Sequence, residues 1–361
     1  MDVATRARTV TEAPAAARGA SRGLPPFPAV AAALKADHEA ALSEVGEVIL
    51  SALGSSVPLI PQVVRHLIGA GGKRLRPLMT LAAAEACGAR GPAPGEGVRG
   101  GDRLLAAAVE MIHAATLLHD DVVDDSALRR GLRTANIVFG NKESVLVGDF
   151  LFARAFELMV ETGSLPVLRI LSAASCTISE GEVLQLETQH NLATTPEMYE
   201  AVVRAKTAAL FAAATESGAA LAGADAARVA ALRDYGMGFG LAYQVVDDAL
   251  DYAGDEAGLG KTAGDDFREG KLTLPVILAV EAARSPEERA FWTRTIGEGR
   301  REEGDFERAA ALMARDGTVE RSLRRAQAYA EDAAASLAAL PPSGVRDRLE
   351  ALALSSVARA A

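Results

Sequence analysis

The sequence predicts an all-α fold, a single large helical bundle around a central cavity. Apolar residues make up 49% of the chain and aromatic residues only 4%, and most of the apolar content is Ala and Leu, which favour helices over strands. Apolar residues recur with helical spacing from Ala29 onward, without an alternating strand pattern. Segments such as Ala205–Ala222 are apolar on more than one face, which is typical of a helix inside a larger bundle.

Residues 28–361 form the predicted domain, and we expect residues 1–27 to be a disordered N-terminal extension. The extension is rich in Ala, Arg and Pro and lacks the apolar central region of a secretory signal. Its arginines resemble an organellar transit peptide only weakly, because Asp2 and Glu12 interrupt the positive charge. We therefore expect a cytoplasmic location, with organellar targeting as the less favoured alternative.

Helical periodicity is clearest in five segments of the domain. These are Leu104–Leu118, Val145–Val160, Ile170–Leu186, Met198–Leu221 and Ala227–Leu250. Stretches that contain Gly and Pro interrupt the pattern at Gly88–Gly101, Gly163–Pro166 and Leu340–Gly344. None of these interruptions separates regions of different composition, so the sequence predicts one domain.

Composition and charge argue against several classes of protein. The formal net charge is −10 and no long Lys/Arg run occurs, which disfavours a nucleic-acid binder. No apolar run of about 18 residues is present, so no transmembrane helix is predicted. Cys87 and Cys176 are too few for a disulfide framework and do not form a zinc motif, and we expect both to be small core residues.

One acidic motif, Asp-Asp-x-x-Asp, occurs twice, each time after a long apolar helical segment. The copies are Asp120-Asp121-x-x-Asp124 and Asp247-Asp248-x-x-Asp251. In a helix, residues i and i+4 project to the same side with i+1 beside them, so each copy concentrates like charges. Magnesium, which is typically shared between one or two carboxylates and substrate phosphates, suits such a site. A solvated acidic patch is the alternative, and two copies make it much less favoured than one would.

Basic residues alternate with the acidic motifs, as the charge of a bound diphosphate requires. Lys73 and Arg76 stand three residues apart after two glycines at the start of an apolar helix, where anions are favoured. Arg129 and Arg130 follow the first acidic motif, and arginine suits bidentate phosphate contacts. Lys206 interrupts an Ala-rich apolar helix, where a lysine needs a partner.

Two glycine-spaced segments with lysines, Gly258–Lys261 and Gly264–Lys271, follow the second acidic motif and suit a lid over phosphates. His113 precedes the first motif, and donation to a phosphate and a structural role are equally open for it. His119 is six residues away on a different helix face, so the two do not chelate a metal, and we expect His119 to be structural.

Together these motifs resemble those of the trans-isoprenyl diphosphate synthases, most closely the long-chain octaprenyl, solanesyl and decaprenyl synthases. The matching stretches run in order from Pro58 to Pro275. They are Gly-Gly-Lys-Arg-Leu-Arg-Pro, Leu-Leu-His-Asp-Asp-Val-Val-Asp, Arg-Arg-Gly, Gly-Glu-Val-Leu-Gln-Leu, Lys-Thr, Tyr-Gln-Val-Val-Asp-Asp-Ala-Leu-Asp-Tyr and Gly-Lys. The resemblance implies that the acidic motifs face each other across the cavity. It also implies a homodimer, or less often a heteromer with a small subunit.

The resemblance further implies a role for each matching residue. It implies about two or three Mg²⁺ ions on Asp120, Asp121, Asp124, Asp247, Asp248 and Asp251. It implies isopentenyl diphosphate on Lys73, Arg76, His113 and Arg130. It implies the allylic diphosphate on Arg129, Lys206, Thr207, Gln244 and Lys261. The catalytic residues that it implies are Asp120, Asp121, Asp124, Asp247, Asp248 and Lys206.

The implied reaction adds isopentenyl diphosphate head to tail, repeatedly, to an allylic diphosphate such as farnesyl diphosphate. Metal-assisted loss of diphosphate gives an allylic cation, the isopentenyl double bond attacks it, and a proton is lost. Product length is expected to depend on the helix before Asp120, because one isoprene unit and one helical turn both span about 5 Å. Ala115 and Thr116, one turn before the motif, are small, whereas a blocking residue is typical of short-chain members.

We therefore predict a product of about forty to fifty carbons, such as a quinone side chain, with a cavity that ends one or more turns beyond Ile112. A shorter-chain geranylgeranyl-type synthase, a non-catalytic regulatory subunit and a terpene cyclase are the alternatives. Regulatory subunits typically lose acidic residues, and the second cyclase motif usually mixes Asn/Asp, Ser/Thr and Glu, whereas both Asp motifs are complete here. Peripheral membrane contact during product release stays open.

Overall fold

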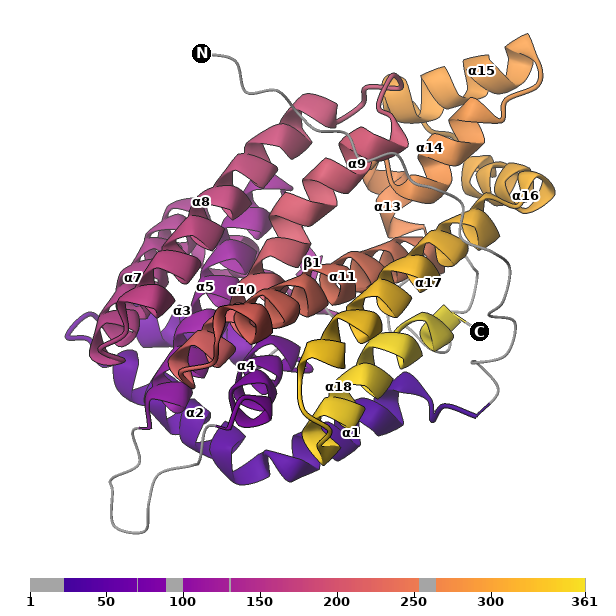
Figure 1. The fold of residues 1–361 in the computed structure, drawn as a ribbon. Coiled ribbons are helices and arrows are strands. Elements are labelled where there is room, and N and C mark those ends of the chain that lie inside the picture. Colours follow the sequence, from indigo (N-terminus) through magenta and orange to yellow (C-terminus); the bar gives the residue numbers. More distant parts are fainter. Residues whose placement is uncertain (1–22, 70, 89–99, 130, 253–263, 361) are drawn as a thin grey trace, which may run out of the picture.

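Helices form nearly all of the described chain in the computed structural model (Figure 1). The structure describes residues 23–69, 71–88, 100–129, 131–252 and 264–360. Within these ranges the one sheet is a two-stranded antiparallel hairpin of β1 (Leu128–Arg129) and β2 (Leu132–Arg133). The predicted all-α fold is confirmed. Arg130 and Lys261 lie outside the described residues, so their roles stay predictions.

The N-terminal half of the described chain contains the first acidic motif at the end of its fifth helix. Its helices are α1 (Phe27–Asp37), α2 (Glu39–Ala52), α3 (Leu59–Gly69), α4 (Leu75–Ala86), α5 (Gly101–Val123), α6 (Ala135–Phe139), α7 (Asn141–Glu161) and α8 (Leu165–Thr188). Helix α1 begins one residue before the predicted domain boundary, and the side chain of Phe27 is only 1% exposed.

The C-terminal half contains the second acidic motif at the end of α11. Its helices are α9 (Pro196–Val203), the π-helix η1 (Arg204–Ala208), α10 (Ala209–Leu221), α11 (Ala226–Leu250), α13 (Asp265–Glu269), α14 (Leu274–Glu281), α15 (Pro286–Trp292), the π-helix η2 (Thr293–Gly297), α16 (Asp305–Asp316), α17 (Thr318–Ser336), the 3₁₀-helix η3 (Leu337–Ala339), α18 (Gly344–Ser355) and the 3₁₀-helix η4 (Val357–Ala360). The predicted helix Met198–Leu221 is helical throughout, but it changes to π geometry around Lys206.

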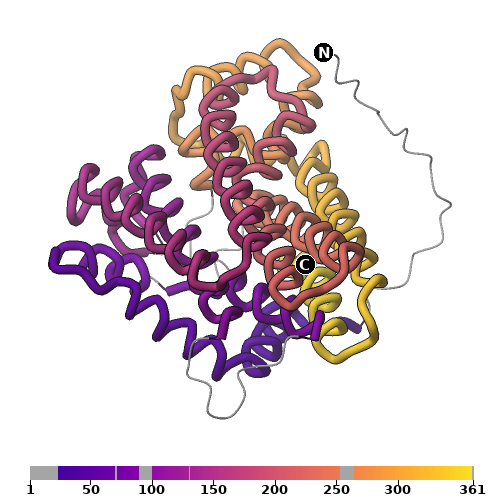
Figure 2. Tube along the Cα trace, turned by 60° about the vertical axis from the view of Figure 1, so that its left-hand side comes forward, coloured from indigo at the N-terminus to yellow at the C-terminus, as the bar shows by residue number. Residues whose placement is uncertain are grey.

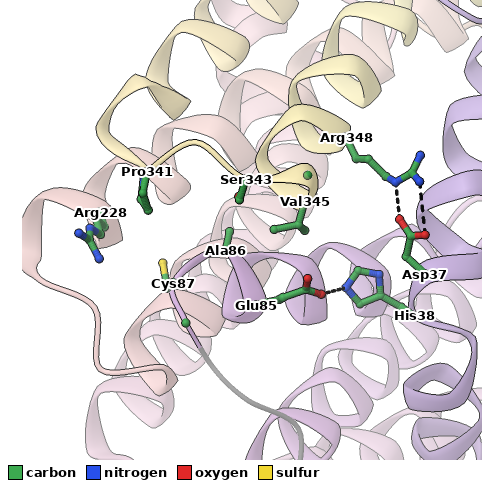
Figure 3. Close-up of a pocket in the computed structure, with 12 residues that line it drawn as sticks. Asp37, His38, Glu85, Ala86, Cys87, Arg228, Pro341, Ser343, Val345 and Arg348 are labelled. Carbon is green, nitrogen blue, oxygen red and sulfur yellow. Dashed lines mark hydrogen bonds and ion pairs between the residues drawn. The ribbon is translucent and has the colours of Figure 1, made fainter.

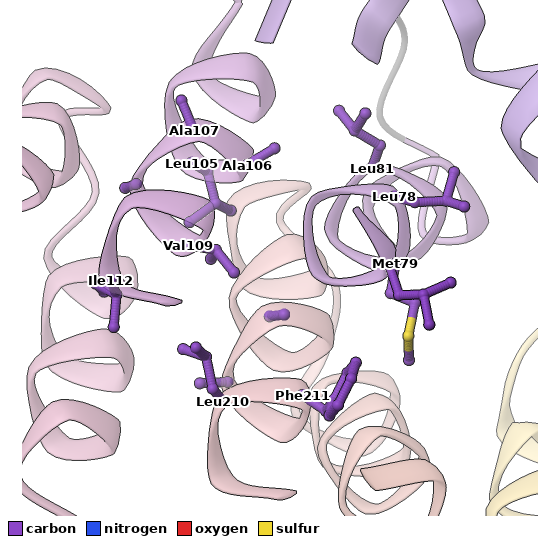
Figure 4. Packing of buried hydrophobic residues seen from close by; sticks show 14 of the residues in the cluster. Leu78, Met79, Leu81, Leu105, Ala106, Ala107, Val109, Ile112, Leu210 and Phe211 are labelled. Atoms are coloured by element: carbon purple, nitrogen blue, oxygen red, sulfur yellow. The ribbon is translucent and has the colours of Figure 1, made fainter. Parts of the chain in front are cut away.

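Helices α4, α5, α10 and α11 lie at the centre of the bundle, with α10 packed on α4 and α11 (Figures 1 and 2). Leu78 and Met79 of α4 and Val109 of α5 are among the buried side chains that fill the space between these helices (Figure 4). Glycine allows the backbones of the central helices to approach each other closely. A Cβ added at Gly236 of α11 would lie 2.4 Å from the carbonyl oxygen of Phe211 on α10. Small residues therefore hold the central helices close together.

Both ends of the described chain pack on this centre. Helix α17 packs along α11, and α18 packs on α17 and on α1, so the first and last helices lie side by side (Figure 1). Helices α13 to α16 form a group at one end of α11 (Figure 1). Among the described helices, none has the length and apolar character needed to cross a membrane.

A surface pocket of about 470 Å³ opens between the end of α4 and the segment that precedes α18 (Figure 3). Its lining includes Cys87, Arg228 and Arg348, and none of the predicted site residues lines it. Burial raises the pKa of the Cys87 thiol, so this cysteine is not an activated nucleophile. Cys87 is half-buried and Cys176 is exposed on α8, so the expectation that both are core residues was wrong for Cys176.

Candidate active site

Both acidic motifs lie at the C-terminal end of a long helix, as predicted. The first motif occupies the last turn of α5, and Asp124 is the C-cap residue of that helix. The second occupies the last turn of α11, and Asp251 is its C-cap. A helix C-terminus carries partial negative charge, which adds to that of the aspartates. Both sites therefore favour a bound cation.

The three aspartates of the first motif do not share one face. The carboxylate of Asp121 is buried and accepts hydrogen bonds from Nε (3.0 Å) and Nη2 (2.7 Å) of Arg129. The side chain of Asn136 donates to the backbone oxygen of Asp121, which ties the turn after α5 to the helix end. Successive helical residues point about 100° apart, so Asp121 faces the protein while Asp120 and Asp124 stay partly exposed.

The second motif also combines buried aspartates with a partly exposed one. The buried carboxylate of Asp248 accepts hydrogen bonds from the Tyr199 hydroxyl (2.5 Å) and from Nε2 of Gln244 (2.7 Å). The Asp251 carboxylate accepts the backbone N–H groups of residues 265 and 266. Asp247 is the partly exposed member. Asp120, Asp124 and Asp247 are thus the motif carboxylates most open to a ligand from outside the protein.

The electrostatics of the motifs show excess negative charge. Burial, together with the nearby carboxylates of Glu182 and Asp124, raises the pKa of Asp120 to about 7 against the opposing effect of Lys206. Burial likewise raises the pKa of Asp248 to about 6, against the hydrogen bonds from Tyr199 and Gln244. A bound divalent cation would favour the ionised carboxylates, so these raised pKa values fit a cation site.

The π-helix η1 positions two of the predicted allylic-diphosphate residues. Lys206 Nζ donates to Oε2 of Glu182 on α8 at 2.7 Å and lies 3.9 Å from Oδ2 of Asp120. Thr207 Oγ1 donates to Oε1 of Gln244 at 3.1 Å. The single turn η1 therefore contacts the first acidic motif on α5 through Lys206 and contacts α11 through Thr207. π-turns inside helices occur frequently at functional sites.

Lys271 was not among the predicted site residues, although the glycine-spaced segment that contains it was noted. Its Nζ lies 3.8 Å from Oδ1 of Asp266. Burial lowers the pKa of Lys271, but Asp266, Glu269 and Asp124 outweigh burial and raise it overall. Lys271 also lowers the pKa of Asp248. This lysine thus interacts electrostatically with both acidic motifs, and a single sequence gives no signal that distinguishes it from Lys261.

Of the residues predicted to bind isopentenyl diphosphate, Arg76 and His113 meet near the start of α4. Arg76 Nη1 lies 3.2 Å from Nε2 of His113, and the Arg76 guanidinium stacks on the Phe211 ring at 4.1 Å. Burial lowers the pKa of Arg76 to about 10, with Glu110 opposing. His119 contacts the backbone oxygen of Val145 on α7 at 3.1 Å, as expected for a structural histidine.

The residues predicted to control product length lie inside the α5 packing layer. Ile112 and Ala115 are fully buried within the main core cluster, and Figure 4 labels Ile112 and Val109 among the side chains of this cluster. Thr116 is partly exposed, and its hydroxyl donates to the backbone oxygen of His113 at 2.8 Å. Ala115 therefore lies about one turn before Asp120 on α5, and its small side chain leaves this position of the helix without a bulky group.

The residues present fit magnesium by their chemistry. Within the described ranges, no three His, Cys, Asp or Glu side chains come together as a closed metal cage. Magnesium does not require one, because it keeps several waters and takes one or two carboxylates together with substrate phosphates. Oδ2 of Asp121 is buried and has no hydrogen-bond partner among the described residues, which leaves acceptor capacity beside the partly exposed Asp120 and Asp124.

Comparison with known proteins identifies the family. The family model described as Polyprenyl synthetase matches residues 57–313. Octaprenyl diphosphate synthase of Escherichia coli is 42% identical over 318 residues, which cover 88% of this chain and 95% of that enzyme.

Solved structures agree with this result. A polyprenyl synthase from Caulobacter crescentus, complexed with calcium and isoprenyl diphosphate, is 51% identical with a TM-score of 0.85, over 92% of this chain and 98% of that one. A decaprenyl diphosphate synthase from Rhodobacter capsulatus is 50% identical with a TM-score of 0.86, over 92% and 99% of the two chains. The resemblance inferred from the motifs is confirmed, and the chain belongs to the polyprenyl synthetase family of trans-polyprenyl diphosphate synthases.

Proposed function

We propose that the enzyme adds isopentenyl diphosphate repeatedly to an allylic diphosphate such as farnesyl diphosphate and releases an all-trans product of about forty to fifty carbons. The observation that carries the proposal is the pairing of two acidic helix ends with Lys206 and Lys271. Lys206 lies 3.9 Å from Asp120, and Lys271 interacts electrostatically with Asp124 and Asp248. A triply charged leaving group needs cations on several sides, and this arrangement supplies them.

Asp120, Asp124 and Asp247 would hold the magnesium ions, because they are the partly exposed carboxylates. Bound magnesium supplies Lewis-acid stabilisation of the departing diphosphate. The related Caulobacter crescentus enzyme is complexed with calcium, which supports a divalent cation here. In this proposal Asp121, Asp248 and Asp251 position the helix ends through their hydrogen bonds with Arg129, Tyr199, Gln244 and the backbone of residues 265 and 266.

The basic residues would divide between two diphosphates. Lys206 would release Glu182 and bind the allylic diphosphate together with Lys271, while Thr207 and Gln244 orient that side of the site. Lys73, Arg76 and His113 would bind isopentenyl diphosphate at the start of α4. Arg130 and Lys261 remain predicted members of these two sets. Because each set holds one diphosphate, the double bond of one substrate can face the reacting carbon of the other.

The long-chain product follows from the small residue at position 115 and from the relatives. Those relatives are named as octaprenyl and decaprenyl synthases, and quinone side chains have such lengths. The bacterial origin of these relatives supports action in the cytoplasm, with peripheral membrane contact when the apolar product leaves.

A homodimer is part of the proposal. Large apolar side chains are exposed on α7 and α8, which pack on each other at one edge of the molecule (Figure 1). They include Leu146, Val160, Leu165, Val183 and Leu186. An exposed apolar surface of this kind marks a protein contact. Sedimentation should therefore give a dimer for the native chain and a monomer for Leu146→Asp/Val183→Asp, whereas Leu50→Asp on α2 should stay dimeric.

One assay tests the proposed reaction directly. Pure protein is incubated with farnesyl diphosphate, isopentenyl diphosphate and Mg²⁺, and the products are sized by chromatography after dephosphorylation. A ladder that ends in a linear alcohol of about forty to fifty carbons supports the proposal. A product that ends near twenty carbons would indicate the geranylgeranyl-type alternative, a cyclic hydrocarbon a cyclase, and no turnover a regulatory subunit.

A further inference from the structure

One continuous helical stretch, α9 with η1, holds the second acidic motif at two points. The Tyr199 hydroxyl donates to Oδ2 of Asp248 at 2.5 Å. Further along the same stretch, Thr207 Oγ1 donates to Oε1 of Gln244 at 3.1 Å. Nε2 of Gln244 in turn donates to Oδ1 of Asp248 at 2.7 Å. Both carboxylate oxygens of Asp248 are therefore held by this stretch, one directly and one through Gln244.

The π-turn brings these two side chains to one face of the helix. Tyr199 and Thr207 are eight residues apart, and in an uninterrupted α-helix such residues point about 80° apart. In η1 the backbone N–H of Ala209 donates to the oxygen of Arg204, five residues earlier, so this turn takes up one extra residue. Across it the pair behaves like residues seven apart, which differ by only about 20°. The π-turn therefore sets the register at which one helix reaches Asp248 from both sides.

Helix α9 is a fixed platform for Tyr199. The next residue, Glu200, accepts the hydroxyl of Tyr329 at 2.5 Å and Nη2 of Arg325 at 2.8 Å, both from α17. The Tyr199 side chain is buried in an apolar cluster with residues of α11 and α14. Burial and then the nearby Asp248 raise the pKa of Tyr199 well above its usual value, so the phenol keeps its proton and stays a donor. The hydroxyl is therefore in place before any ligand binds.

We propose that Tyr199 is a positioning residue for the reaction, which acts through Asp248 to fix the last turn of α11 and the direction of the partly exposed Asp247. The inference rests on the proposed function. Without the hydroxyl, one oxygen of a buried carboxylate loses its partner, and the end of α11 becomes free to shift. The same helical stretch carries Lys206, which lies 3.9 Å from Asp120. Tyr199 and the π-turn thus fix the second motif relative to the first.

Tyr199→Phe tests this role because it keeps the ring and removes only the hydroxyl. Calorimetry measures Mg²⁺ binding to the protein with inorganic diphosphate, so that no reaction occurs. The affinity for Mg²⁺ should fall about 5- to 30-fold, because a hydrogen bond to a buried charged group is lost. In steady-state assays kcat should fall about tenfold and the half-saturating Mg²⁺ concentration should rise. The KM of isopentenyl diphosphate should stay within about twofold, because the contacts at the start of α4 are unchanged.

Tyr235→Phe is the matched control. Tyr235 lies on the same helix α11, is fully buried, and donates its hydroxyl to the backbone oxygen of Leu349 at 2.7 Å. Its loss should lower Tm about as much as Tyr199→Phe does, but should leave the Mg²⁺ affinity unchanged. Equal Mg²⁺ affinities of the two variants would overturn the inference, since the hydroxyl of Tyr199 would then contribute only to stability.

A double-variant cycle tests whether the two contacts act together. Thr207→Val removes the donor at the other end of the network. Because both donors act on the pair Gln244 and Asp248, the double variant should lose less Mg²⁺ affinity than the product of the two single losses. Losses that simply multiply would refute the shared network.

The same measurements separate this inference from the proposed function. If the native chain binds Mg²⁺ with diphosphate and makes product while Tyr199→Phe behaves like it, only this inference fails. If the native chain does neither, the proposed function itself fails.

Discussion

Nζ of Lys206 lies 2.7 Å from Oε2 of Glu182. The same ammonium is 3.9 Å from Oδ2 of Asp120, so carboxylates from α8 and α5 compete for it. Glu182 adds negative charge that raises the pKa of Asp120, after the larger effect of burial. Glu182 therefore holds Lys206 beside the first acidic motif, in position to move to a diphosphate when one binds.

The Glu182→Gln variant tests this positioning role. We expect kcat to fall about tenfold, with a rise in KM for the allylic substrate, because a neutral amide holds the ammonium less firmly. The expected change in KM for isopentenyl diphosphate is small. Glu187→Gln, on the exposed side of α8, is the control. Equal effects of the two substitutions would show that Glu182 has no special relation to Lys206.

The contact between α8 and the π-helix predicts a second effect. A Cβ added at Gly181 would lie 2.8 Å from the backbone nitrogen of Lys206 and from Cβ of Ala205. Gly181→Ala should therefore push η1 away from α8, cost about 1–3 kcal/mol of unfolding free energy, and lower kcat. Gly344→Ala, where an added Cβ meets nothing within 4 Å, should leave both unchanged. Denaturant unfolding and steady-state kinetics measure the two quantities.

The sequence predicted those features that depend on periodicity and local spacing. The five strongest helical segments all lie within helical parts of the structure, and both acidic motifs end their helices, because each follows an uninterrupted apolar repeat. The approach of Arg76 to His113 could be predicted only through the family resemblance, since 37 residues separate them.

The features that were missed depend on tertiary contacts. The buried carboxylate of Asp121 is paired with Arg129, which lies on β1 after the end of α5. The π-helix around Lys206 packs closely against Gly181, and the Ala-rich composition reveals neither feature. Nη1 of Arg359 on η4 lies 3.7 Å from Oδ1 of Asp247, because α18 packs on α1 and η4 packs on α11. A single sequence without homologues gives no signal for such contacts.

The different environments of neighbouring aspartates predict opposite stability effects. In metal-free buffer, Asp120→Asn should raise Tm, because it removes a carboxylate whose charge is disfavoured by partial burial and by the nearby Glu182 and Asp124. Asp121→Asn should instead cost about 1–3 kcal/mol, because it breaks the ion pair with Arg129. Thermal unfolding with EDTA and with MgCl₂ measures both. Magnesium and inorganic diphosphate should raise Tm of the native chain more than that of Asp120→Asn. A Tm decrease in both variants in EDTA would contradict the assignment.

The buried position of Ala115 predicts control of product length. Its side chain is fully buried, one turn before Asp120. Ala115→Phe should shorten the main product to about fifteen to twenty carbons, because each isoprene unit spans about one helical turn. Overpacking should also cost about 1–3 kcal/mol, so the folded fraction is checked by circular dichroism. Ala115→Ser keeps the side chain small and should keep the native length. If folded Ala115→Phe still made the native product, the growing chain would not pass this turn of α5, and the cavity would have to run along another helix.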